Sequence, residues 1–188
     1  MLSKLLSDAL QTLLFRYFQP EHYRYSPFAV LGVLLLLGLV NAAAMTPLLG
    51  NSTPAILLAI LLTMVKWYVL ATVMGRWLVR SGEAPLNLWG YTLATEALAI
   101  PSLLVFYQPS LALLGMLWQM WTFLAQAIGF IRIGRTTGGR VMLGYVGYFV
   151  GTMLVGSLVV MMFAQTGALD LQEIHAKIQQ MLTQSTAP

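Results

Sequence analysis

Long apolar stretches divide the chain, and the short segments between them hold most of its charged residues. A helix rises about 1.5 Å per residue and the hydrocarbon core of a bilayer is about 30 Å thick, so about 20 apolar residues span it. Prolines stand at or just before several starts, where a missing N–H is harmless. The pattern predicts five transmembrane helices at about residues 27–49, 54–79, 86–107, 109–131 and 141–163.

The same stretches argue against a β-barrel. Inside lipid every backbone donor and acceptor must be paired within the protein, which leaves helices or a closed barrel. Barrel strands alternate apolar and polar residues, whereas the runs Leu34–Leu37 and Ala42–Ala44 do not alternate. The expected fold is therefore all-α, a polytopic membrane protein built as a bundle of five transmembrane helices.

Amphipathic segments flank the spans. In residues 1–19 apolar side chains recur at the i, i+3, i+4, i+7 spacing of one helix face, which is typical of a helix lying flat in the headgroup region. The alternative is a helix packed on loops of the bundle. Asp170 and Glu173 form an N-cap box after the last span. We expect residues 1–26 to be a cytoplasmic interfacial helix with its linker, and 164–188 to be a short extracytoplasmic amphipathic tail.

The composition agrees with a lipid environment. Of 188 residues, 59% are hydrophobic and only 9% are charged, whereas about a quarter of the residues of a soluble domain are charged. The chain has no cysteine, which excludes disulfides and thiolate metal sites. Its net charge is +4, with the cations placed between apolar runs, so we expect membrane lipids and not nucleic acid as the partner.

The lysines and arginines gather on one side of the predicted bundle, because every second connecting segment carries them and the others carry almost none. They lie before the first span, around the connection of the second and third, and between the fourth and fifth. Because cytoplasmic loops carry excess Lys and Arg, this predicts a cytoplasmic N-terminus and an extracytoplasmic C-terminus. We expect five of these residues to contact lipid headgroups: Arg76, Arg80, Arg132, Arg135 and Arg140.

Two ionisable residues, Lys66 and Glu96, lie well inside predicted spans. A charge near the bilayer centre costs at least about 2.5 kcal/mol, so each needs a partner or water. Their depths differ by only about 6 Å at the helical rise, a gap that a lysine stem covers. We therefore expect an ion pair, either as a structural clamp or as part of a proton or ion path.

Further polar and small residues point to helix contacts. Gln119 and Gln126 share one face of the fourth span, and Asn41 lies in the first. Such side chains form hydrogen bonds between helices or line a water-filled cavity. Helix packing is expected from the small residues of the fifth span, which let backbones approach closely within the bundle or in a homodimer. These are Gly144, Gly147 and Gly151.

Enzyme motifs are missing from the sequence. It has no HExxH, no GxSxG and no carboxylate cluster, and the glycine-rich segment 134–140 lacks the Lys-Ser/Thr ending of a P-loop. We expect no catalytic residue, no metal and no other cofactor.

Several segments resemble the Yip1-domain family of membrane proteins. Leu-Trp-Gly-Tyr at 88–91, followed by Ala-Ile-Pro-Ser-Leu-Leu at 99–104, resembles the family's third span, where Gly-Tyr precedes a mid-span proline. Residues 121–130 look like its fourth span, and 135–145 with the glycine-rich span look like its last loop and helix. The resemblance covers roughly residues 27–165.

The resemblance implies a five-span bundle with the same orientation, in a short bacterial form in the cytoplasmic (inner) membrane. Eukaryotic members act in vesicle traffic and bind Rab-type GTPases, and the family has no catalytic residues to carry over.

Two functions follow as hypotheses. The first is a non-enzymatic protein that organises the membrane or assists other membrane proteins, alone or as a homo-oligomer. The second is a small transporter, channel or lipid scramblase with a polar track through Lys66, Glu96, Gln119 and Gln126. A transport path needs these side chains to face one continuous hydrated cavity, whereas a scaffold needs them paired and dry.

Overall fold

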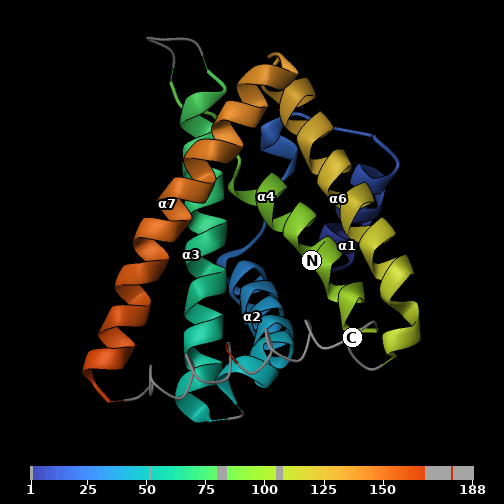
Figure 1. Ribbon diagram of the computed structural model, residues 1–188. Helices are drawn as coiled ribbons and strands as arrows, with labels where there is room; N and C mark the ends of the chain where they lie inside the picture. Colours follow the sequence, from blue (N-terminus) through green and yellow to red (C-terminus); the bar gives the residue numbers. More distant parts are fainter. Residues whose placement is uncertain (1, 51, 80–83, 105–107, 168–178, 180–188) are drawn as a thin grey trace.

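All regular secondary structure in the described part of the chain is helical in the computed structural model (Figure 1). The described residues are 2–50, 52–79, 84–104, 108–167 and 179. Within them, four helices are long and apolar enough to cross a membrane. They are α2 (Pro27–Leu49), α3 (Thr53–Trp77), α6 (Ala112–Ile133) and α7 (Gly138–Gln165). The all-α expectation is confirmed, and four of the five expected spans are long apolar helices, which fits a polytopic membrane protein.

Local signals explain where the first two long helices begin. The Ser26 hydroxyl accepts a hydrogen bond from the Ala29 N–H at 3.4 Å, and Ser52 accepts one from Ala55 at 3.3 Å. Each cap satisfies a donor that the first turn leaves free, and a proline follows in that turn. A one-turn 3₁₀ helix, η3 (Pro109–Leu111), leads into α6 in the same region where the sequence predicted the fourth span to start.

The segment expected as the third span is not one continuous α-helix. It consists of α4 (Trp89–Glu96) and a 3₁₀ helix, η2 (Ala97–Ser102), while residues 105–107 lie outside the described part. Pro101 lies inside η2 and supplies no N–H. In α4 the hydroxyls of Thr92 and Thr95 donate back to the carbonyls of Leu88 and Tyr91, a bond that bends helices. Pro101, Thr92 and Thr95 therefore explain why this segment has a short α-helix followed by a tighter 3₁₀ helix.

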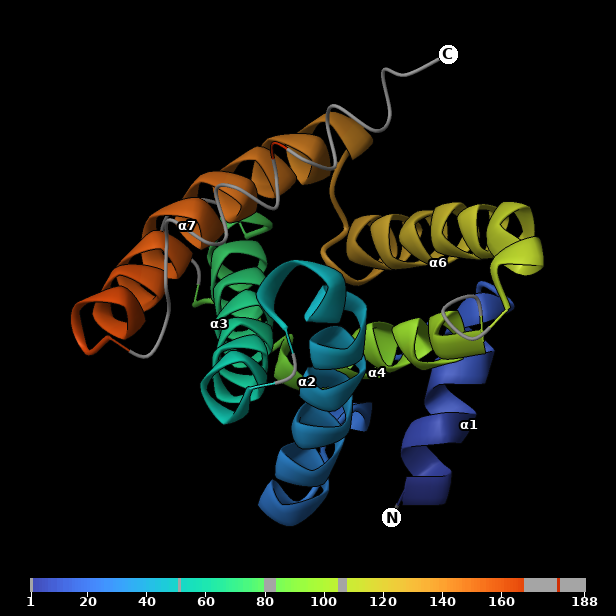
Figure 2. The same cartoon turned by 60° about the horizontal axis from the view of Figure 1, so that its bottom comes forward.

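The helix α3 lies in the middle of the arrangement, with α2 and α7 packed along it and α4 between α3 and α6 (Figures 1 and 2). The helices α6 and α7 meet at their connection and diverge from it (Figure 1). Gly144, Gly147 and Gly151 of α7 face α3: a Cβ added at Gly144 would lie 2.8 Å from Met74 Sδ, and one at Gly151 would lie 3.0 Å from Val69 Cγ1. The glycines therefore lie at a contact within the bundle.

The N-terminal helix α1 (Leu2–Leu13) ends before the expected residue 19 and packs against α4, α6 and η2. It therefore packs on helices of the bundle, and Lys4 and Asp8 also bond the connection that leads into α2. The one-turn helix η1 (Pro20–His22) lies in the connection to α2. The first residues of the predicted tail 164–188 form the end of α7. From residue 168 onward, the tail lies outside the described part, apart from Gln179.

Candidate functional site

The amide of Gln126 is the centre of a buried polar cluster. Its Nε2 donates to Thr95 Oγ1 at 2.8 Å, and its Oε1 accepts from the Tyr145 hydroxyl at 2.7 Å. Gln126 is only 9% exposed. The side chain thus joins α4, α6 and α7, and its donor and acceptor are both satisfied by protein.

Two tyrosines bond the backbone of α6 beside this cluster. Tyr91 donates to the Gln126 carbonyl at 2.9 Å, and Tyr17 donates to the Ala125 carbonyl at 2.8 Å. Gly129 makes room for both rings, because an added Cβ would overlap the Tyr91 hydroxyl and lie 2.8 Å from Tyr17 Cε1. Through Tyr17 the segment after α1 is held to the middle of α6.

The predicted ion pair of Lys66 and Glu96 is not formed. Among the described residues, the one ion pair within 4.0 Å joins Asp8 and His22. Lys66 is exposed and lines a groove of about 680 Å³ between α3 and α7, beside Tyr148 and Thr152. The lysine therefore lies at the groove between α3 and α7, and Glu96 is half-buried at the end of α4.

The other predicted polar residues have separate surroundings. Asn41 Nδ2 donates to Thr63 Oγ1 at 2.9 Å and joins α2 to α3. Gln119 is exposed and lines a different cavity, of about 500 Å³, with Val40 and Ser102. Gln126 and Asn41 are paired in the interior, whereas Lys66 and Gln119 face two cavities with different walls.

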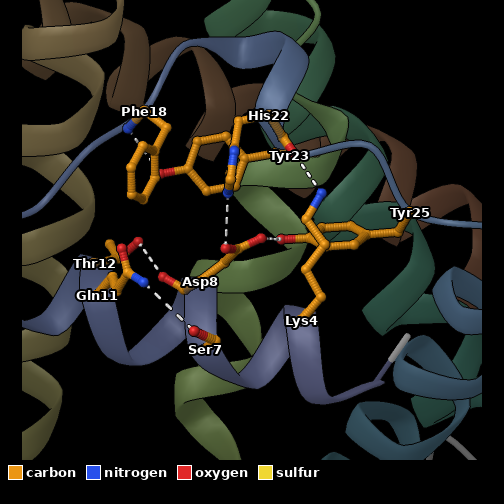
Figure 3. Close-up of polar contacts among 9 residues, drawn as sticks. All are labelled: Lys4, Ser7, Asp8, Gln11, Thr12, Phe18, His22, Tyr23 and Tyr25. Carbon is orange, nitrogen blue, oxygen red and sulfur yellow. Dashed lines mark hydrogen bonds and ion pairs between the residues drawn. The ribbon is translucent and has the colours of Figure 1, made fainter.

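A second polar cluster, which the sequence reasoning did not find, anchors α1 (Figure 3). Asp8 is 3% exposed, and its Oδ1 lies 3.0 Å from His22 Nε2. Its Oδ2 accepts from the Tyr25 hydroxyl at 2.8 Å, and Lys4 Nζ donates to the His22 carbonyl at 2.7 Å. The carboxylate thus ties α1 to the chain that leads into α2.

Burial also affects the tyrosines of this region. Burial raises the pKa of Tyr17 to about 12, with a smaller contribution from Tyr23. Burial likewise raises the pKa of Tyr25 above its ordinary value, and the hydrogen bond to Asp8 adds to the effect. Both phenols stay protonated near neutral pH and donate the bonds described above.

A signal for Asp8 was present in the sequence. Leu5, Asp8, Ala9 and Thr12 follow the same i, i+3, i+4, i+7 spacing as the apolar face, and all four are buried. Asp8 and Thr12 are polar, so a pattern of apolar residues alone does not include this second face.

The opposite side of α1, together with the turn that follows it, carries a leucine row, Leu6, Leu10 and Leu14, which are 54%, 60% and 66% exposed. The helix end beside this row is fixed to α6: Trp121 Nε1 donates to the Leu13 carbonyl at 3.2 Å, and Phe15 packs edge-on to Trp121 at 5.1 Å between ring centres. The expected apolar face is therefore divided, with one part against the bundle and the leucine row left uncovered.

The arginines gather where α3 and α6 end and α7 begins. Arg140 Nε donates to the Trp77 carbonyl at 3.0 Å, and its Nη2 donates to the Val79 carbonyl at 2.6 Å, so it caps the end of α3. Arg76, Arg132 and Arg135 are exposed, and Arg80 lies outside the described residues.

Comparisons with protein-family models, with curated proteins and with solved structures found no match to this chain. Within the described residues, no group of three or more His, Cys, Asp or Glu side chains is placed to hold a metal ion.

Proposed function

We propose that this chain is a non-enzymatic, five-span membrane protein that organises the membrane by inserting the leucine row of α1 into one leaflet. The observation that carries the proposal is the leucine row itself, because α1 presents it outward while its other side, with Leu5 and Asp8, is buried against the bundle.

Apolar side chains that enter the acyl region of one leaflet add area to that leaflet and not to the other, and amphipathic helices that insert in this way are sensitive to curvature. A free amphipathic helix leaves the surface and returns to it. Here Leu13 at the end of α1 and Tyr17 in the segment after it are bonded to α6. The leucine row of each copy therefore stays attached to the bundle.

The topology belongs to the same proposal. The segment of α4 and η2 would complete the fifth crossing, which gives a cytoplasmic N-terminus, an extracytoplasmic C-terminus and an inner-membrane location. The gathering of arginines at the α6–α7 connection supports this orientation. Resemblance to the Yip1-domain family supports the same count of spans, and membrane lipids, further copies of the chain or other membrane proteins would be its partners.

Reconstitution into vesicles tests the proposal. Wild-type protein should reduce vesicle diameter or form tubules as its density rises, measured by cryo-electron microscopy. Replacing Leu6, Leu10 and Leu14 together by Ala should abolish most of this effect. The matched control replaces the exposed Leu113, Leu114 and Leu117 of α6 by Ala and should remodel as wild type does. Equal remodelling by both triple variants would disprove the role of α1.

The transport alternative is supported by the groove that contains Lys66. It is opposed by Gln126 and Asn41, whose side chains are bonded to other helices and not to one open path. Ion flux and lipid scrambling in the same vesicles should stay at the background of protein-free vesicles. Flux that Lys66→Met abolishes would favour the alternative.

A further inference from the structure

A polar pocket of about 470 Å³ opens where three of the long helices come together at their ends. Its walls come from residues 78–79 after α3, from 133–136 between α6 and α7, and from the segment that contains Gln19 and Glu21. Because α3 and α6 end here and α7 begins here, a membrane around these helices would place its headgroups at this level.

The pocket holds charges of both signs. Arg135 and Arg140 line it together with Glu21. The guanidinium of Arg140 is held in place by the Trp77 and Val79 carbonyls and keeps further N–H groups for a ligand. No ion pair within 4.0 Å joins Glu21 to either arginine in the described structure, so the opposite charges line one pocket without cancelling in direct contact.

The end of α6 places Arg135 here. Arg135 has a φ of 47°, because it is the left-handed residue of the Schellman motif that ends α6. Its N–H donates to the Arg132 carbonyl at 3.4 Å, and the Thr136 N–H donates to the Ile131 carbonyl at 3.1 Å. This motif lies in the connection that carries Arg135 to the wall of the pocket.

We propose that this pocket binds the phosphoethanolamine headgroup of a membrane lipid. The two guanidinium groups suit the phosphate, because their planar forks match its oxygens. The carboxylate of Glu21 suits the primary ammonium, which carries three N–H donors. Thr136 and Gln19 add hydrogen-bonding groups at the wall. A pocket for a simple anion would not place a carboxylate beside its arginines. The proposal depends on the membrane placement of the long helices but not on the leucine row of α1.

Native mass spectrometry of the full chain in detergent tests the proposal with phosphatidylethanolamine, phosphatidylglycerol and phosphatidylcholine of equal acyl length. Wild-type protein should bind phosphatidylethanolamine about fivefold more tightly than phosphatidylglycerol, the effect of one partly exposed charge pair. It should also bind phosphatidylethanolamine more tightly than phosphatidylcholine, whose trimethylammonium has no N–H to donate to Glu21. Glu21→Gln should remove the preference over phosphatidylglycerol without weakening phosphatidylglycerol itself. Arg135→Gln should weaken the binding of both lipids.

Arg24→Gln is the matched control, because Arg24 is exposed and does not line the pocket. It should leave all three affinities unchanged. Thermal unfolding of each variant separates lost binding from lost folding. Tighter binding of phosphatidylglycerol by wild type would overturn the proposal, as would an ethanolamine preference that survives Glu21→Gln. Displacement of the lipid by soluble phosphoethanolamine at equal concentration would overturn the assignment to a lipid.

Discussion

At the scale of single residues, Gln126 shows how a polar side chain is tolerated among apolar helices. Its amide donates to Thr95 and accepts from Tyr145, so neither end is left without a partner. Burying an amide in an apolar interior without a hydrogen-bond partner costs roughly 2–7 kcal/mol. The cluster therefore stabilises one rotation of α6 against α4 and α7.

Gln126→Leu should lower the free energy of unfolding by about 1–2 kcal/mol, because Thr95 and Tyr145 each lose a partner. Unfolding of the protein in detergent, followed by circular dichroism, measures the change. Gln119→Leu is the control on the same helix, since the exposed Gln119 side chain makes no such bond. Equal losses in both variants would show that the hydrogen bonds of Gln126 add nothing.

Gly129 is a second residue whose size is decisive. Gly129→Ala should destabilise the protein by about 1–3 kcal/mol, because the new methyl overlaps the Tyr91 hydroxyl and crowds the Tyr17 ring. Gly32→Ala should be neutral or stabilising by up to about 1 kcal/mol, because nothing lies within 4 Å of its added Cβ in α2. The same unfolding measurement compares them. A neutral Gly129→Ala would mean that the two rings can move at no cost.

At the scale of elements, α1 is held by polar bonds as much as by apolar packing. Asp8 binds His22 and Tyr25 (Figure 3). Tyr17, in the segment after α1, binds α6. The helical repeat predicted that α1 exists and is amphipathic. It could not show which side faces the bundle, because two faces of the helix share the same spacing and only the partner helices distinguish them.

Alkaline pH should release α1. Since the pKa of Tyr17 is raised to about 12, above the ordinary value of 10, its contribution to docking is complete below about pH 10. This contribution is lost as the pH rises towards 12, because Tyr17 of the undocked chain is already deprotonated in this range. A fluorophore on Leu10→Cys reports docking, and the chain has no other cysteine. The signal should change between these pH values.

In Tyr17→Phe the docked state should be weaker at neutral pH, because the bond to Ala125 is missing, and its further loss above pH 10 should be smaller. Tyr68→Phe, on the exposed side of α3, is the control and should keep the wild-type profile. A pH profile of Tyr17→Phe identical to that of wild type would contradict a role for this phenol.

At the scale of the whole molecule, the short segment of α4 and η2 decides how many times the chain crosses the membrane. Single cysteines at Asn87 and Ser110 flank this segment, and both positions are exposed. If the segment crosses, an impermeant thiol reagent should label Ser110→Cys but not Asn87→Cys in intact cells. Gly139→Cys should resist labelling and Ser52→Cys should accept it, which fixes the two sides. Labelling of positions 87 and 110 from one side would reduce the crossings to four.

The sequence by itself determined the four long helices and most of their ends. Apolar length, serine caps and prolines act within a few residues of one another, and lipid leaves the backbone no alternative to local pairing. Pro101 was visible as well, but its effect on η2 depends on the neighbours that support a tightened turn.

Only the tertiary structure decided which side chains meet. Lys66 and Glu96 have matching depths along the chain, yet no ion pair joins them, whereas Gln126 finds partners on two other helices. Depth follows from counting residues, but partnership depends on the rotation and crossing of whole helices. The rotation and crossing of helices depend on shape at many contacts at once, such as the glycines of α7 against α3. They therefore cannot be read from any single stretch of sequence.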